Sequence, residues 1–225
     1  MTSAAITGPL DLLWALGAIA AIFAVIAWRE RRRSRAMAAV AETLGLTFEA
    51  NVDAQGTVAA LRALADVPLL GRRFHQSSTN AMAGRRGGRE VRVFDFTFRH
   101  RKRGRGYTEL TVVLLPGGGA GLPDFVLAPE NVLQKLGEVF GCEDIDFLTH
   151  SEFSERYHLR GADEAAIRRA FSAEALETIG RECGWHVEVA NGHLAAYRGT
   201  KRLSPKKVPD LVDGTLRIVE MLAPR

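Results

Sequence analysis

The sequence predicts an α+β protein, in which a single N-terminal transmembrane helix precedes a cytoplasmic domain with an antiparallel sheet and packed helices. Three observations predict this class. A long apolar segment lies near the amino terminus, and the middle of the chain alternates with the period of a β-strand. The predicted strands and helices also do not alternate as βαβ units, which excludes a doubly wound parallel sheet.

Residues 10–28 form the apolar segment. Leu12 to Trp28 supplies 17 residues without a charge, close to the roughly 20 residues that cross a bilayer as an α-helix. Pro9 precedes it, and proline suits the first position of a helix. Trp14 and Trp28 lie toward the two ends, where indole rings prefer the membrane interface. The residues are apolar all round the predicted helix, which favours a membrane helix over a buried helix of a soluble protein.

The charges around the apolar segment predict its orientation. Residues 1–9 contain no Lys or Arg, whereas five arginines follow the segment at once. A cleaved signal peptide has the opposite pattern, so cleavage is not favoured. The excess of positive charge predicts an N-terminus outside a bacterial plasma membrane and a cytoplasmic C-terminal domain. The predicted membrane-interface residues are Trp14, Trp28, Arg29, Arg31, Arg32, Arg33 and Arg35.

The predicted organisation has four parts. They are an extracytoplasmic N-terminus at residues 1–9, a transmembrane helix at 10–28, a basic juxtamembrane helix at 29–45, and a cytoplasmic domain at 46–225. Gly45 is expected to end the juxtamembrane helix in a left-handed conformation. The domain is long enough for one sizeable core or two small ones. A division into sub-lobes 46–141 and 151–225 therefore stays open.

Periodicity and turn residues predict the elements of the domain. Strands are expected at 72–83, 91–98 and 107–115, which form a meander, and at 125–127, 156–159, 185–189 and 194–197. Helices are expected at 58–65, 129–139, 162–181 and 208–222. Phe171-Ser172 should break the third of these helices, and Asn191-Gly192 is a strong two-residue hairpin signal.

A basic loop separates two strands of the meander. It contains Arg99, Arg101, Lys102, Arg103 and Arg105. This loop carries a formal charge of +5, and residues 29–35 carry +4. The net charge of the whole chain is only +4, so the remaining residues together are negative. The high pI therefore reflects two local clusters of positive charge. Aromatic residues interleaved with these charges are also scarce, so nucleic-acid binding is not favoured. The loop either contacts anionic lipid or is a solvated loop whose charge protects a sheet edge.

Two segments contain residue types that are common in binding or catalytic sites. The glycine-rich residues 116–121, PGGGAG, lack the lysine and the following helix of a phosphate-binding loop. Asp144, Asp146, His150 and Glu152 lie close together, but without the spacing of a known metal motif. A flexible turn and a polar connection are the favoured interpretations, respectively. No catalytic, cofactor-binding or metal-binding residue is predicted, and no cofactor.

Three further residues have simple interpretations. Cys142 and Cys183 have no partner at CxxC spacing, and both are expected as buried thiols in a reducing cytoplasm. Asp95 stands within an apolar strand, on the side opposite Phe94 and Phe96. It is either exposed or paired with an arginine such as Arg92.

The order of several segments resembles a family. The segments are LGLTF, GREVRVFDFTF, LPDFVLAPENVLQKLG, FSERYHLRG, DEAAIRRAF and WHVEVANGHLAAYR. Together they resemble uncharacterised bacterial single-pass membrane proteins with a cytoplasmic α+β domain. The resemblance spans most of the chain and implies the same placement and one fold. It supplies no catalytic residues that could be carried over to this chain.

The predicted function is that of a membrane-tethered cytoplasmic interaction domain without enzymatic activity. Its expected partners are the membrane it spans and either a protein, a second copy of the chain or the anionic inner leaflet. The alternative is an enzyme of unknown class that uses the region from Asp144 to Glu152. That alternative requires those side chains to meet in a concave pocket.

Overall fold

The computed structural model describes residues 9–51, 74–99, 107–130 and 144–222. Its helices are α1 (Pro9–Leu44), α4 (Ser151–Arg156), α5 (Glu164–Ala170), α6 (Ala173–Arg181), the 3₁₀ helix η1 (Pro205–Lys207) and α7 (Val208–Leu222). Its strands are β1 (Thr47–Asn51), β2 (Phe74–Arg86), β3 (Arg89–Arg99), β4 (Tyr107–Leu115), β5 (Phe125–Pro129), β6 (Tyr157–Arg160), β7 (Trp185–Ala190) and β8 (His193–Arg198). The α+β class is confirmed.

The strands join one sheet in the order β1-β2-β3-β4-β8-β7-β5-β6, and every neighbouring pair is antiparallel. The expected meander forms β2 to β4. The C-terminal hairpin then adds to its free side, with Val112 of β4 opposite Tyr197 of β8. Both regions that were considered as sub-lobes therefore contribute strands to the same sheet.

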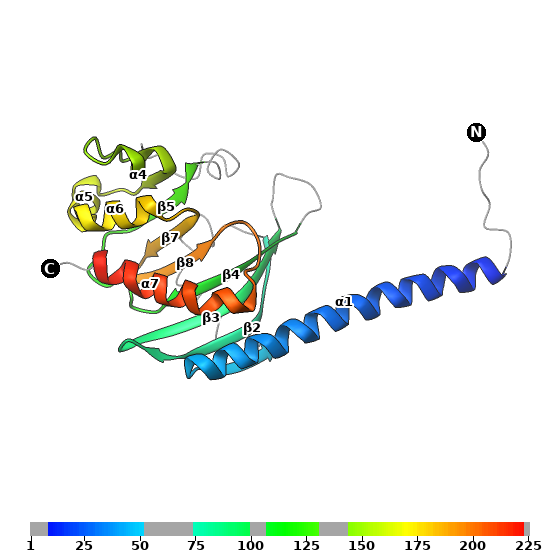
Figure 1. Ribbon diagram of the computed structural model, residues 1–225. Coiled ribbons are helices and arrows are strands. Elements are labelled where there is room, and N and C mark those ends of the chain that lie inside the picture. Colours follow the sequence, from blue (N-terminus) through cyan, green and yellow to red (C-terminus); the bar gives the residue numbers. More distant parts are fainter. Residues whose placement is uncertain (1–8, 52–73, 100–106, 131–143, 223–225) are drawn as a thin grey trace, which may run out of the picture.

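The sheet has two buried faces. On one face, Val91, Val93 and Val113 pack with residues of α1, α5, α6 and α7 in a single hydrophobic cluster. Figure 1 shows these helices gathered on that face. The opposite face holds a second cluster that includes Phe94, Phe96 and Phe98. The alternation along β3 follows the two-residue period of a strand, so Asp95 points toward the helices.

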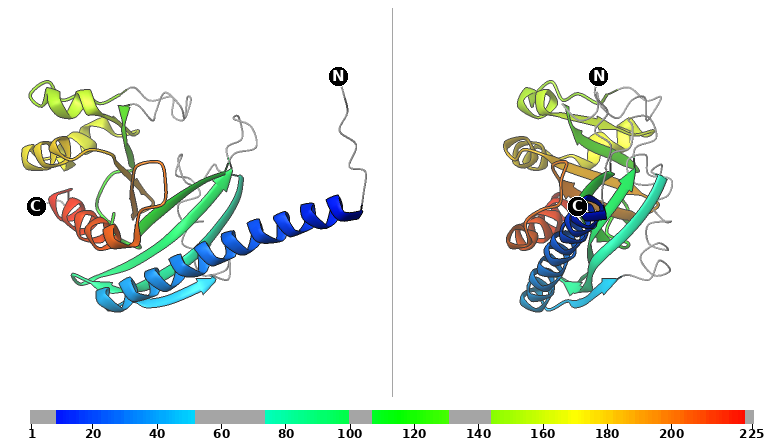
Figure 2. Two further views of the ribbon diagram at one scale, coloured as in Figure 1. Left: turned by 45° about the vertical axis from the view of Figure 1, so that its right-hand side comes forward. Right: turned by 90° about the vertical axis from the view of Figure 1, so that its right-hand side faces the viewer.

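Helix α1 has an exposed half and a packed half. Its residues from Leu12 to Trp28 are exposed, whereas Met37, Ala41 and Leu44 are buried against the domain at helical spacing. Figures 1 and 2 show the N-terminal half projecting away from the sheet as part of one continuous helix. Among the described residues this is one helix long and apolar enough to cross a membrane.

The end of α1 has the geometry of a Schellman motif. The amide of Leu46 donates to the carbonyl of Ala41, and the amide of Gly45 donates to the carbonyl of Glu42. Gly45 has φ +69, which confirms the expected left-handed cap. Because the motif reverses the chain sharply, β1 starts two residues later and pairs with β2 beside the packed half of α1.

The predicted helix break and hairpin turn are both present, whereas one strand is longer than predicted. The break at Phe171-Ser172 is confirmed, since the Ser172 side chain caps α6 by accepting a hydrogen bond from Ala175. Asn191 and Gly192 have φ 51 and 74 and form the predicted hairpin turn. Strand β2 continues to Arg86, beyond its expected end at residue 83. The helices expected at 58–65 and 129–139 lie wholly or almost wholly outside the described residues, as does residue 142.

Candidate functional site at the base of the exposed helix half

Arg33 of α1 binds Asp95 of β3 where the exposed half of the helix meets the domain. The Nε and Nη2 atoms of Arg33 donate to Oδ2 and Oδ1 of Asp95, both at 2.7 Å. The Asp95 side chain has 0% exposure and that of Arg33 has 14%. This planar, two-point pairing is the strong form of an arginine–carboxylate interaction. It fixes both the rotation of α1 and its position along the sheet.

Two polar side chains of the sheet complete the surroundings of Asp95. Asn80 donates through Nδ2 to Oδ2 at 2.9 Å, and the hydroxyl of Thr111 donates to Oδ1 at 2.9 Å. The Thr111 hydroxyl in turn accepts from Nη2 of Arg33 and from the amide of Leu203. The carboxylate therefore accepts four hydrogen bonds, which offset the cost of its burial.

Asn80 reaches Asp95 because β2 contains a bulge. Thr79 lies opposite Asp95 while Met82 lies opposite Val93, so β2 holds one extra residue between them. Asn80 has φ 53, a left-handed conformation that asparagine tolerates better than most residues. The extra residue places Asn80 and Met82 on the helix face of the sheet, where the amide meets the buried carboxylate.

Arg202 joins the same network from the loop between β8 and η1. Its guanidinium contacts Glu30 of α1 at 2.7 and 3.0 Å and Glu109 of β4 at 3.0 Å. Nη1 of Arg33 also donates to the carbonyl of Leu203 at 2.8 Å. Glu30 lies beyond the predicted spanning residues, and its hydrogen bond with Arg202 lowers the pKa of its carboxyl. The same bond raises the pKa of Arg202.

These side chains form a junction between α1 and the domain, which we call the helix junction. It consists of Glu30, Arg33, Asn80, Asp95, Glu109, Thr111 and Arg202. Breaking a buried pair of this kind typically costs about 3–5 kcal/mol, because one charge stays buried without its partner. The hydrogen bonds of the buried carboxylate are all directed within the protein, so the arrangement suits attachment rather than chemistry on a substrate.

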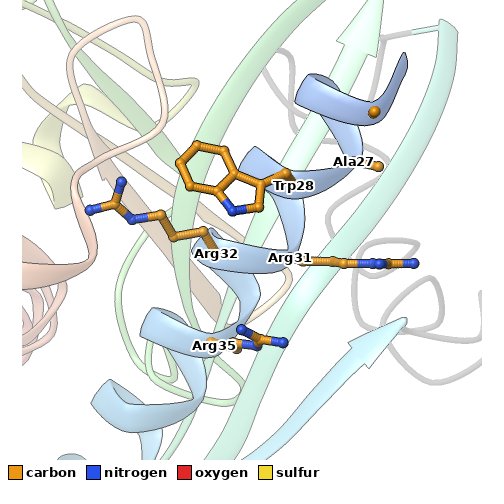
Figure 3. A pocket seen from close by; sticks show the side chains of 6 residues that line it. Ala27, Trp28, Arg31, Arg32 and Arg35 are labelled. Atoms are coloured by element: carbon orange, nitrogen blue, oxygen red, sulfur yellow. The ribbon is translucent and has the colours of Figure 1, made fainter. Parts of the chain in front are cut away.

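The remaining predicted interface residues lie on the exposed part of α1. Trp14 and Trp28 have exposures of 79% and 59%. Arg29, Arg31, Arg32 and Arg35 are exposed, in contrast to Arg33. A hollow of ≈ 510 Å³ lies on this helix, lined by Ala24, Ala27, Trp28, Arg31, Arg32 and Arg35 (Figure 3). The guanidinium carbon of Arg32 lies 5.6 Å from the centre of the Trp28 ring, within range of a cation–π contact.

The side chains of the acidic segment, Asp144 to Glu152, do not meet at one point. Asp144 binds His158 and accepts from the amide of Leu159, while Glu152 pairs with Arg156. His150 bonds to Thr149, and Asp146 is exposed. In the described part of the chain no group of three or more His, Cys, Asp or Glu side chains could hold a metal ion. These contacts tie the segment to β6 and α4.

Other sequence predictions are settled by individual contacts. Asp95 is paired with an arginine, but the suggested partner was wrong: Arg92 binds Glu90 at 2.7 Å, and Arg33 binds Asp95. In the glycine-rich turn the amide of Gly118 donates to Leu115 and that of Gly119 to Gly192. Both amides therefore donate to backbone carbonyls within the protein, as expected for a structural turn. Cys183 is a free thiol, as expected, but it is exposed, so the prediction that it is buried was wrong. Residues 100–106, which contain most of the basic loop, lie outside the described residues.

Sequence reasoning missed most of the helix junction. Glu30 stood inside a run of arginines, and Asn80, Thr111 and Arg202 had no distinguishing local pattern. The one usable signal was Asp95, because a lone carboxylate in an apolar strand requires a cation if it is buried. The identity of that cation depends on which helix packs over β3.

A solved protein structure is similar to this chain over most of its length. No protein-family model and no curated protein sequence matches the chain. It is similar to the crystal structure of the mycobacterial trehalose monomycolate transport factor A, TtfA, with 14% sequence identity and a TM-score of 0.54. The match covers 87% of this chain and 98% of that chain. At this identity the likeness shows a shared fold and nothing further.

Proposed function

We propose that this protein is a non-enzymatic accessory factor of a bacterial plasma membrane, which presents its cytoplasmic domain to a membrane-embedded protein partner. The observation that supports it best is α1 itself. One uninterrupted helix joins an exposed apolar half to a half that the domain holds through Arg33 and Asp95. A tether that only retained a domain at a membrane would not need this buried attachment.

The proposed topology follows from the two halves of α1. Residues 10–28 span the bilayer, with Trp14 and Trp28 at its two interfaces. The arginines that follow Trp28 lie on the cytoplasmic side. Since Glu30 and Arg33 already contact the domain, the loop that contains Arg202 lies within about two helical turns of the membrane surface. The domain is therefore held close to the bilayer in one orientation.

The proposed role as an accessory factor draws on the structural neighbour. TtfA is named as a transport factor. A shared fold does not transfer a substrate, so the proposal takes from it only the class of role: a protein that assists a membrane process without catalysing a reaction. The enzyme alternative is less favoured, because the side chains from Asp144 to Glu152 bind separate partners.

Crosslinking and affinity capture from native membranes tests the proposal. The full-length protein, tagged after Arg225, should be recovered with the membranes, and its tag should be accessible only from the cytoplasm. The captured neighbours should be integral membrane proteins. Arg33→Gln should stay in the membrane fraction but lose the captured neighbours severalfold, whereas Lys206→Gln, which removes an exposed charge near α1, should keep them.

Two results would contradict the proposal. Recovery of the full-length chain in the soluble fraction, or a tag accessible only from outside, would exclude the topology. Capture of the same neighbours by the wild type and by Arg33→Gln, at equal yield, would show that the fixed orientation of the domain has no role in partner binding.

A further inference from the structure

Helix α1 presents two different faces just beyond the predicted spanning residues. With about 100° between successive residues, Arg33, Met37 and Ala41 lie within an arc of about 80° that contacts the domain. Ala24, Trp28, Arg31 and Arg35 lie within an arc of about 60°, centred about 150° around the helix from the first. The hollow of Figure 3 therefore opens away from the domain.

The lining of this hollow changes from apolar to cationic along the helix axis. Ala24 and Ala27 form the part nearest the N-terminus, and Trp28 lies about one turn after Ala24. Arg31, Arg32 and Arg35 form the remainder, and Arg32 lies against the Trp28 ring, which holds the indole in place. Figure 3 shows Arg32 and Arg31 extending to opposite sides of Trp28, with Arg35 further along the helix.

The three guanidiniums have no neutralising partner among the described residues. No ion pair with an acidic side chain is found there for Arg31, Arg32 or Arg35, although Arg33, between them in sequence, binds Asp95. Guanidinium groups without counter-charges favour an anion, and their planar geometry matches that of phosphate oxygens. A ligand that is apolar at one end and a phosphate at the other would match the whole hollow.

We propose that this hollow binds one anionic phospholipid of the cytoplasmic leaflet. The glycerol and upper acyl carbons lie against Ala24, Ala27 and the Trp28 ring. The phosphate lies beside Arg31 and Arg35, which are about one helical turn apart on the same arc, and Arg32 adds positive charge from beside the Trp28 ring. This inference rests on the proposed topology, which places Trp28 at the cytoplasmic interface, and it names a lipid partner for that location. The bound lipid neutralises a cluster whose charges would otherwise repel one another.

Native mass spectrometry of the full-length protein, purified from mixed vesicles of phosphatidylglycerol and phosphatidylcholine, tests the site. The wild type should retain phosphatidylglycerol in preference to phosphatidylcholine. Each guanidinium near an anionic lipid changes binding by about fivefold. The triple variant R31Q/R32Q/R35Q should therefore lose retained phosphatidylglycerol by well over tenfold, and Trp28→Ala should lose it to a smaller extent.

The matched control removes the same charge nearby. Lys201, Lys206 and Lys207 are exposed and lie in or beside η1, so K201Q/K206Q/K207Q should keep the retained lipid. Equal losses in both triple variants would show diffuse attraction and overturn the site, as would no loss in R31Q/R32Q/R35Q. A chain that never enters the vesicles would instead contradict the proposed topology, so the two failures are distinguishable.

Discussion

Arg33 and Asp95 are 62 residues apart in sequence, yet their side chains are joined by two hydrogen bonds of 2.7 Å each. One residue belongs to the helix that begins in the apolar segment, and the other to the third strand of the sheet. Because the carboxylate is fully buried, the attachment of the helix and the stability of the sheet depend on the same pair.

Loss of the Arg33 side chain should destabilise the folded protein. Arg33→Gln leaves the buried Asp95 carboxylate with hydrogen bonds from Asn80 and Thr111, and the nearest cation is then Arg202, at 3.9 Å. The expected cost is about 3–5 kcal/mol, measured by thermal or denaturant unfolding of the full-length protein in micelles. Arg29→Gln removes an exposed arginine one turn earlier and should change stability by less than about 0.5 kcal/mol.

A double variant separates the buried charge from the packing. Arg33→Met combined with Asp95→Leu replaces the ion pair with apolar side chains and should recover most of the lost stability. A double variant as unstable as Arg33→Gln would contradict this account and would indicate that the specific hydrogen bonds, rather than the isolated charge, determine the loss.

The start of a soluble fragment should decide its stability. A fragment of residues 29–225 keeps Glu30 and Arg33, whereas 36–225 removes both and leaves Asp95 without its arginine. Urea unfolding should show the shorter fragment to be less stable by several kcal/mol. Adding Asp95→Leu to residues 36–225 should narrow the difference, and equal stability of the two unmodified fragments would rule out a structural role for the junction.

Glu30 should contribute a specific part of the acid sensitivity. The Arg202 hydrogen bond lowers its pKa from the ordinary value of 4.5, so the ionised form is favoured in the folded protein. The contribution of ionised Glu30 to the free energy of unfolding is fully present above pH 4.5 and is lost as the pH falls through the lowered pKa. Stability should therefore decline less steeply below pH 4.5 in Glu30→Gln than in the wild type.

The complementary variant provides the control for Glu30. Arg202→Gln removes the cause of the shift, so adding Glu30→Gln to it should change the acid profile very little. The readout is the midpoint of urea unfolding across the acid range. Parallel profiles for the wild type and Glu30→Gln would contradict a lowered pKa at this carboxyl.

Gly45 should be required for the sharp end of α1. Its φ of +69 is costly for residues with a Cβ, and the Schellman hydrogen bonds depend on it. Gly45→Ala should cost about 1–2 kcal/mol in the same unfolding measurement. Gly88→Ala, at φ +75 in the β2–β3 turn, tests the same backbone effect far from α1. If Gly45→Ala left stability unchanged, the motif would not constrain the start of β1.

Local sequence signals predicted many elements correctly, but they do not show how distant segments pair. Ser172 and Asn191-Gly192 act through hydrogen bonds and backbone angles within a few residues, so the sequence shows them directly. The end of β2 was predicted too early because Gly84 pairs within the sheet, opposite Val91, and the turn is formed by Gly87 and Gly88. The addition of β8 beside β4 joins segments far apart in the chain, and no local pattern encodes which strands meet.

The same contrast applies to the candidate site. The exposure of Trp28, Arg31, Arg32 and Arg35 agrees with the composition of the segment that contains them. Arg33 has the same residue type and the same neighbours, yet it points in the opposite direction and binds Asp95. One turn of a helix distributes adjacent residues over all sides, and only the packing of α1 on the sheet selects which arginine becomes buried.

The sequence by itself determined the apolar helix, the charge distribution that follows it, the turns and caps, and the α+β class. These depend on composition and on periods of two and 3.6 residues, which are local properties of the chain. The tertiary structure alone decided the strand order, the bulge that directs Asn80, and the partner of Asp95. Those depend on contacts between distant segments, where burial makes one pairing of charges far more favourable than the others.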